Sequence, residues 1–75
     1  MRAVIGNVSY IGAAKDIIMQ LKLEDYTKYS NLQEYQENIG RRVRLFNGNR
    51  ISYSNNLEFL KELRRIGFLD SLEID

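Results

Sequence analysis

The 75-residue chain contains no histidine, cysteine, proline or tryptophan. Without histidine it lacks the side chain that most often transfers protons near neutral pH, and without cysteine it lacks the thiol nucleophile. The same two absences exclude disulfides and remove the usual ligands of zinc, haem iron, copper and iron–sulfur clusters. We therefore expect no cofactor, no metal site and no enzymatic activity, and the composition favours a binding function.

The composition is typical of one small globular domain, which we expect to span residues 1–75. Hydrophobic residues make up 44% of the chain and charged residues 28%. A domain of this size buries only about 60% of its unfolded surface, so stability must come from packing, helix capping or a partner subunit, and a homodimer is one expectation. No apolar run approaches the roughly 18 residues that span a bilayer. The N-terminus also lacks the apolar stretch of a signal peptide. These features predict a cytoplasmic protein with no membrane contact.

The net charge of +1 conceals an uneven distribution of charge along the chain. Residues 1–40 hold four basic and five acidic side chains, and residues 41–65 hold seven basic and two acidic ones. The last ten residues hold three acidic side chains and no basic one. A local basic surface is therefore expected in the second half of the chain, although it is modest beside that of a dedicated nucleic-acid binder.

The first eleven residues predict a β-hairpin. Gly6-Asn7 suits a type II′ turn, because glycine accepts a positive φ at the first central position. This register sets Ile5 opposite Val8 and Ala3 opposite Tyr10, with all four on one face. After Gly12, apolar residues recur at spacings of three and four and predict a helix over about 13–23.

Two capping boxes predict two further helices. Ser30-Asn31-Leu32-Gln33 fits a box with Ser30 as the N-cap, followed by a helix over about 31–46. Asn55-Asn56-Leu57-Glu58 fits a second box, and that helix should end in a Schellman motif at Gly67 and Phe68. The inner arc of the 31–46 helix is predicted to hold Leu32, Tyr35, Ile39, Val43 and Phe46.

Residues 41–46 also allow a strand interpretation. Asn47-Gly48 is a strong hairpin turn signal, and apolar residues alternate with arginines just before it. A two-residue hairpin there would pair Leu45 with Arg50 and Arg44 with Ile51, which mixes apolar and polar side chains on both faces. The helix explains the pattern better. The sequence thus predicts an α+β fold with an N-terminal hairpin, three helices, and short strands near 50–53 and 70–74 that complete a small sheet.

No motif with recognisable catalytic spacing is present. Glu58 and Glu62 share a helix face with compensating basic residues, as solvated ion pairs do. The Gly6–Gly12 segment lacks the Lys-Ser/Thr that follows a phosphate loop. Ser9 and Ser52 have no histidine to activate them.

The arginine cluster is the best functional candidate. In the helical interpretation, Arg41 and Arg44 lie opposite the apolar arc and Arg42 flanks it. Three explanations stay open: a solvated face, a site for an acidic protein surface, or a site for phosphates of nucleic acid. The candidate partner-binding residues are Arg41, Arg42, Arg44, Leu45, Arg50 and Tyr53.

Leu45 and Tyr53 have two explanations each. If the helix continues through residue 46, Leu45 lies exposed between arginines and resembles an interface anchor with a polar rim. If the helix frays at residue 44, Leu45 turns inward. Tyr53, like Tyr26 and Tyr29, lies in a predicted connector, where it either covers the small core or contributes to an interface.

The order of these elements resembles a group of small, mostly uncharacterised proteins of Clostridia, other Firmicutes and their phages. Such proteins often carry a proline near the start of the first helix, and this chain has none. The resemblance implies an accessory protein of a bacterium, prophage or mobile element, and it implies no activity or site. It rests on Ile5-Gly6-Asn7, Ser30-Asn31-Leu32-Gln33-Glu34-Tyr35, Arg41-Arg42-Val43-Arg44, Phe59-Leu60 and Gly67-Phe68-Leu69.

We therefore predict a non-catalytic protein-interaction module, of the phage or mobile-element inhibitor or regulator type. It would act by covering an acidic surface of a larger target with the arginine cluster. The alternative is a small, dimeric nucleic-acid-binding regulator that uses the same arginines on phosphates.

Overall fold

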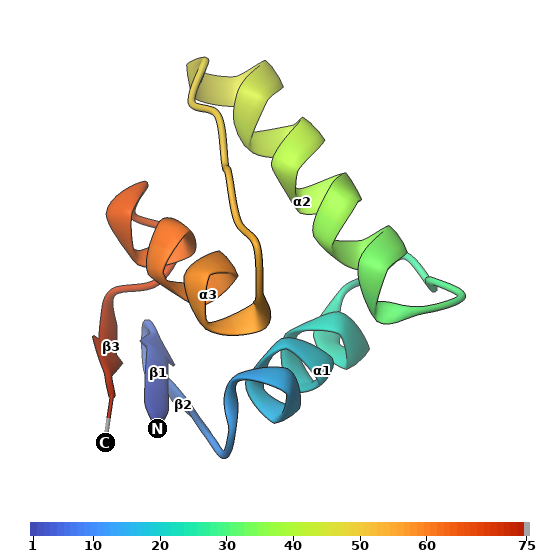
Figure 1. Cartoon of the computed structure of the whole chain (residues 1–75). Coiled ribbons are helices and arrows are strands. Elements are labelled where there is room, and N and C mark those ends of the chain that lie inside the picture. The colour runs from blue at the N-terminus through green and yellow to red at the C-terminus, as the bar shows by residue number, and fades with distance from the viewer. Residues whose placement is uncertain (75) are drawn as a thin grey trace.

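The predicted α+β architecture is confirmed by a computed structural model, which describes residues 1–74. Two strands form an N-terminal hairpin, three helices follow, and a last strand returns to the hairpin (Figure 1). The sheet is antiparallel, with strand order β2-β1-β3. The elements are β1 (Arg2–Ile5), β2 (Val8–Ile11), α1 (Ala14–Glu24), α2 (Leu32–Asn47), α3 (Asn56–Arg65) and β3 (Ser71–Glu73).

The hairpin has the predicted turn and register. Gly6 has a φ of 58°, whereas no non-glycine residue has a positive φ, as a type II′ turn requires. Ile5 pairs with Val8 and Ala3 pairs with Tyr10. Ala3 and Tyr10 are buried, but Val8 beside the turn is exposed. Burial raises the pKa of Tyr10 to about 12, and its hydroxyl donates a hydrogen bond to Glu24 at the end of α1.

Of the two extra strands expected, one forms. β3 pairs with β1, which confirms the strand expected near 70–74. The strand expected near 50–53 is wrong, because this segment lies outside the β2-β1-β3 sheet. The backbone of that segment is satisfied by α3 instead: the Ser52 N–H donates to Glu62 Oε1 at 3.2 Å, and the Arg50 carbonyl accepts from Arg65 Nη2 at 2.9 Å.

The start of α2 lies one residue later than its predicted cap. Asn31, rather than Ser30, is the N-cap, and its side-chain oxygen accepts a hydrogen bond from the Glu34 N–H at 2.9 Å. The Glu34 carboxylate accepts in turn from the Ser30 N–H at 3.4 Å. Glu34 thus reaches the N–H one residue before the cap and not that of Asn31, so only one of the two bonds of a capping box forms at Asn31.

Both ends of α3 follow the prediction. The Asn55 side chain caps α3 by accepting from the Glu58 N–H at 2.9 Å. At the far end, the Phe68 N–H donates to the Leu63 carbonyl at 2.9 Å and the Gly67 N–H donates to the Arg64 carbonyl at 3.2 Å. These two bonds define the predicted Schellman motif, with Gly67 at a φ of 85°.

Helix α2 continues to Asn47 and ends at Gly48, which has a φ of 73°. Residues 41–46 are therefore helical, which excludes the strand interpretation. The prediction that Phe46 lies on the inner arc is wrong, because its side chain is 88% exposed. The C-terminal end of α2 extends past the other helices (Figure 1), and no residue of α2 beyond Val43 is buried.

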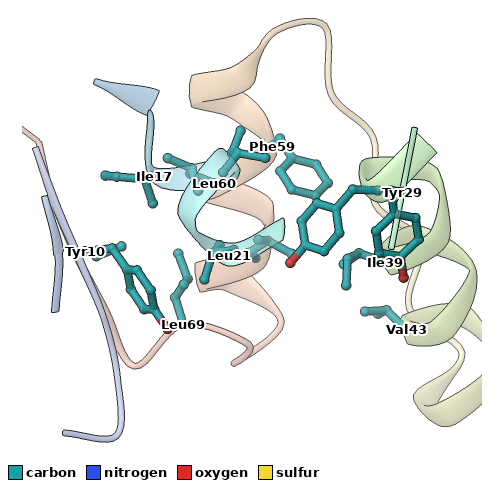
Figure 2. Packing of buried hydrophobic residues seen from close by; sticks show 13 residues of the cluster. Tyr10, Ile17, Leu21, Tyr29, Ile39, Val43, Phe59, Leu60 and Leu69 are labelled. Carbon is teal, nitrogen blue, oxygen red and sulfur yellow. The ribbon is translucent and has the colours of Figure 1, made fainter. Parts of the chain in front are cut away.

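The core lies in layers between the sheet and α2. Figure 2 shows Tyr10 on the sheet side, side chains of α1 and α3 in the middle, and Ile39 and Val43 of α2 on the opposite side. Helices α1 and α3 pack against each other and against the sheet, and α2 packs mainly on α1. The buried apolar side chains are Ala3, Tyr10, Ile17, Ile18, Leu21, Tyr29, Tyr35, Ile39, Val43, Phe59, Leu60, Leu63 and Leu69.

Alanine should have opposite effects on stability at Gly67 and at Gly40. Gly67→Ala should lower the free energy of unfolding by about 1 kcal/mol, because alanine is strained at a φ of 85°. Gly40→Ala should raise it by up to about 1 kcal/mol, because Gly40 lies inside α2 and a Cβ there would meet nothing within 4 Å. Urea denaturation of both variants measures the two changes, and a loss of stability in Gly40→Ala would contradict this assignment.

Candidate interaction surface at the end of helix α2

The candidate surface is the C-terminal half of α2 with the connector that follows it. Three of the predicted residues meet there: Arg41, Arg44 and Arg50 line one hollow of about 400 Å³, together with Gly40 and Ile51. Arg41 and Arg44 lie one turn apart on α2, and Arg50 comes from the connector that runs back along the helix (Figure 1). The sequence suggested the helical pair, and the fold adds the third arginine.

Within residues 1–74, the side chains of these three arginines have no hydrogen bond or ion pair. Two neighbouring arginines do have acid partners, since Arg42 pairs with Asp25 and Arg65 pairs with Glu62. The three arginines of the hollow therefore present positive charge that the described part of the chain does not neutralise.

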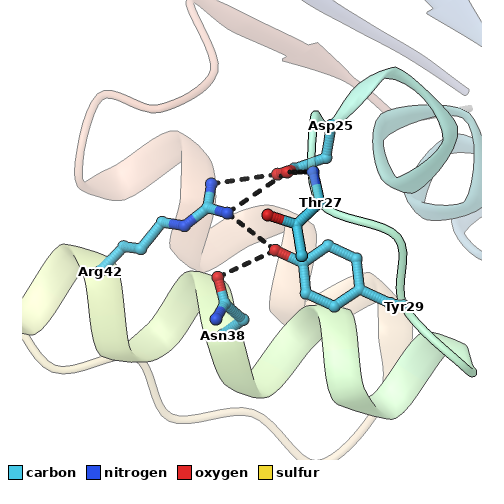
Figure 3. Close-up of polar contacts among 5 residues, drawn as sticks. All are labelled: Asp25, Thr27, Tyr29, Asn38 and Arg42. Atoms are coloured by element: carbon cyan, nitrogen blue, oxygen red, sulfur yellow. Dashed lines mark hydrogen bonds and ion pairs between the residues drawn. The ribbon is translucent and has the colours of Figure 1, made fainter.

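Arg42 differs from these three arginines because it is tied to other parts of the fold, although its side chain stays 43% exposed. Its two terminal nitrogens donate to the Asp25 carboxylate at 3.0 and 3.3 Å, and one of them also donates to the Tyr29 hydroxyl at 2.7 Å. The Tyr29 hydroxyl donates onward to the Asn38 side-chain oxygen at 3.0 Å (Figure 3). Arg42 thus ties α2 to the connector after α1, which gives it a structural role at the edge of the candidate surface.

The environment of Asp25 stabilises its charged form. The hydrogen bonds from Arg42 lower its pKa, with a further contribution from the Thr27 N–H, which donates to the carboxylate at 2.9 Å. Desolvation opposes this shift, and the Asp25 side chain is only 11% exposed against 43% for Arg42. The bidentate geometry is the strong form of an arginine–carboxylate pair, so this contact fixes the position of α2.

Tyr53 lies against the core and not in the arginine hollow. Its ring packs edge-on against Phe59, with the centroids 4.9 Å apart, and burial raises its pKa. The structure therefore places Tyr53 as a partly buried cover over α3, the first of the two explanations that the sequence left open.

Two large apolar side chains lie exposed at the end of α2. Leu45 is 80% exposed and Phe46 is 88% exposed. Since the helix continues through residue 47, Leu45 faces outward, as the first of its two explanations requires. Arg41 lies one turn before Leu45, so that an apolar side chain and a basic one adjoin on the surface of the helix.

An apolar groove adjoins Phe46, between the C-terminal ends of α2 and α3. It has a volume of about 310 Å³, and its lining includes Val43, Phe46, Ile66 and Phe68. Sequence reasoning missed this groove because it placed Phe46 in the core and treated Phe68 only as part of a helix ending. The available signal was length, since a helix of this length (Leu32–Asn47) outruns the small core that the chain can form.

The surface holds basic and apolar groups but no recognisable catalytic group. The stretch 38–57 contains four arginines and no aspartate or glutamate. Within residues 1–74, no group of three or more carboxylates could hold a metal ion, and no buried side-chain nitrogen or oxygen lacks a hydrogen-bond partner. The geometry supports binding of an anionic, partly apolar partner.

Comparison of the chain with models of protein families, with curated proteins and with solved structures gives no match. No helix within residues 1–74 combines the length and apolar character needed to cross a bilayer.

The Asp25–Arg42 pair predicts a pH-dependent contribution to stability. Asp25→Asn should lower the free energy of unfolding by about 1 kcal/mol at pH 7, after allowing for solvent screening of the half-exposed arginine. Because the pKa of Asp25 is lower in the folded state, this contribution is fully present above its ordinary pKa of 3.8 and is lost as the pH falls through the folded-state value.

Urea denaturation of the wild type and Asp25→Asn at pH 7 and at about pH 2.5 measures this effect. The free energy of unfolding should differ between the two proteins by about 1 kcal/mol at pH 7 and by much less at acidic pH. Arg42→Gln is the matched control, and combining it with Asp25→Asn should add little at pH 7, since both remove the same contact. A difference that does not change with pH would show that the pair contributes no electrostatic stability.

Proposed function

We propose that this chain is a non-catalytic protein-interaction module that regulates or inhibits a larger target by covering an acidic surface of it. The observation that carries the proposal is the end of α2, where Leu45 and Phe46 are exposed beside unpaired arginines. Apolar anchors with a charged rim are typical of protein interfaces.

Charge supports an acidic protein as the partner. Arg42 is paired with Asp25, but Arg41, Arg44 and Arg50 have no acid partner within residues 1–74. A complementary surface would therefore supply negative charge to these three arginines. Two copies of this chain that met face to face through α2 would oppose arginine to arginine. A different protein is therefore favoured over a homodimer at this surface.

The mechanism is occlusion. Helix α2 is fixed to the domain by Tyr35, Ile39 and the Arg42–Asp25 pair, so that its free end is presented in one orientation. A preorganised helix end loses little conformational entropy on binding. An accessory protein of a bacterium, prophage or mobile element, which is the setting that the resemblance implies, would use such a surface to block a host target.

Charge reversal on α2 should abolish target binding without unfolding the chain. Immobilised wild-type protein should retain a stoichiometric protein partner from a nuclease-treated bacterial lysate, and Arg41→Glu with Arg44→Glu should not retain it. Both arginines are exposed and unpaired within the described part of the chain, so the variant should keep its unfolding midpoint. Lys15→Glu with Lys61→Glu makes the same charge change on exposed residues elsewhere and should bind normally. Equal retention by both variants would refute the docking surface.

The apolar anchors predict a second effect on the same target. Leu45→Ser with Phe46→Ser should weaken binding of the purified target by about a hundredfold, since loss of two interface anchors costs at least about 2.7 kcal/mol. The variant should fold normally, because neither side chain is in the core. Calorimetric titration measures the affinity, and serine substitution of the exposed Val8 and Ile11 on β2 is the matched control. An unchanged affinity would exclude these side chains from the interface.

The arginine hollow favours one second candidate, a nucleic-acid-binding regulator in which the same arginines contact phosphates. That function predicts that captured material disappears on nuclease treatment. It also predicts an affinity for nucleic acid that falls by about one log unit per decade of salt for each phosphate contacted.

A further inference from the structure

The hollow beside α2 has a feature that protein docking does not explain. Gly40 lies in the interior of the helix, where glycine costs about 1 kcal/mol relative to alanine. Packing does not require a glycine at this position, because a Cβ at residue 40 would meet no other atom within 4 Å. The consequence of the glycine is open space over the helix backbone, and that space lies in the hollow that the three arginines line.

The three arginines are placed there by separate elements. Arg41 follows Gly40 directly on α2, and Arg44 lies one turn after Gly40. Arg50 reaches the hollow from the connector, and its backbone is fixed because its carbonyl accepts a hydrogen bond from Arg65 Nη2 at 2.9 Å. Arg65 is held in turn by Glu62, with a nitrogen–oxygen distance of 2.6 Å. The hollow is thus bounded by two anchored segments rather than by one flexible loop.

Charge identifies the kind of ligand. Three guanidinium groups that line one hollow of about 400 Å³ repel one another, and no acid of residues 1–74 is paired with any of them. A multiply charged anion relieves this repulsion better than a single carboxylate does. Arginine also matches the oxygens of a phosphate with paired N–H donors. Ile51 adds an apolar wall that suits the organic part of a phosphate ester.

We propose that Arg41, Arg44 and Arg50 form a binding site for a phosphate monoester dianion, seated over Gly40 and against Ile51. The site shares its three arginines with the proposed docking surface, but it needs no protein partner and is tested on the isolated chain. Its failure would therefore leave the proposed function standing, and failure of target capture would leave this site standing.

Nuclear magnetic resonance titration of the ¹⁵N-labelled chain at pH 8 tests the site. Inorganic phosphate represents the free ligand, a short phosphoserine peptide represents a phosphorylated side chain, and acetate with the unphosphorylated peptide are the controls. Saturable shifts at residues 40, 41, 44 and 50 are expected with both phosphates, and acetate should bind about tenfold more weakly. Binding of the phosphopeptide should weaken near pH 5, because its phosphate then carries about one negative charge rather than two.

Two source-specific outcomes follow from the two probes. Tighter binding of the phosphopeptide than of inorganic phosphate would assign the site to a modified side chain, with Ile51 contacting the peptide. Equal affinities would assign it to free phosphate ligands. Shifts that do not saturate, or that spread equally over the other basic residues of the surface, would overturn the site.

Three variants separate a built site from general surface charge. Gly40→Leu fills the floor of the hollow but keeps every charge, and it should weaken phosphate binding at least about tenfold while the chain stays folded. Arg44→Gln should weaken binding to a similar extent. Arg64→Gln removes the same charge from an exposed position outside the hollow and should have little effect. Wild-type affinity in Gly40→Leu would refute the proposal even if Arg44→Gln weakened binding, since charge alone would then explain the attraction.

Discussion

The rest of the structure depends on one mismatch of size, because α2 is longer than the core to which it is attached. A helix that spans Leu32–Asn47 is about 24 Å long, whereas the core of this small chain supports only its first three turns. Tyr35, Ile39 and Val43 are buried, and no residue of α2 beyond Val43 is. The last turn is consequently surface on nearly all sides, and the exposure of Leu45 and Phe46 follows from that position.

A projecting helix end must be anchored at its base, and polar contacts do part of that work. The Tyr29 hydroxyl accepts from Arg42 and donates to Asn38, while the Tyr29 ring packs edge-on against Tyr35 at a centroid distance of 5.3 Å. One residue of the connector thus contacts both the apolar and the polar side of α2. The Asp25 carboxylate completes this contact, so the orientation of α2 depends on a segment that has no regular secondary structure.

Most of the fold could be predicted because local rules decide it. The II′ turn at Gly6, the cap at Asn55 and the Schellman motif at Gly67 each involve residues close in sequence, and their spacing specifies the backbone conformation. Two wrong predictions concern residues whose structure depends on contacts with segments distant in the sequence. The segment 50–53 is no strand, and its backbone is hydrogen-bonded instead to the side chains of Glu62 and Arg65 on α3. Phe46 has the periodicity of a core residue, but its burial depends on whether another element reaches it.

The same distinction applies to the candidate site. The helical positions of Arg41, Arg44 and Leu45 follow from 100° per residue, so their exposure could be predicted once residues 41–46 were taken as helix. The partner of Arg42 could not be predicted, because Asp25 lies 17 residues away across a connector whose path no motif specifies. The sequence also could not show that Arg50 lines the same hollow as Arg44. The position of Arg50 depends on the hydrogen bond that its carbonyl accepts from Arg65 on α3.

The arrangement at the end of α2 places two different chemistries around one rigid helix. On one side the arginine hollow over Gly40 offers charge and open backbone, and beside Phe46 the groove toward α3 offers apolar surface. Leu45 is exposed on the same last turn. A partner that contacts only the hollow gains charge pairs that salt screens, and one that contacts only the groove gains apolar burial without orientation. Contact with both fixes a single orientation, which is what a protein needs if it acts by covering a defined surface of its target.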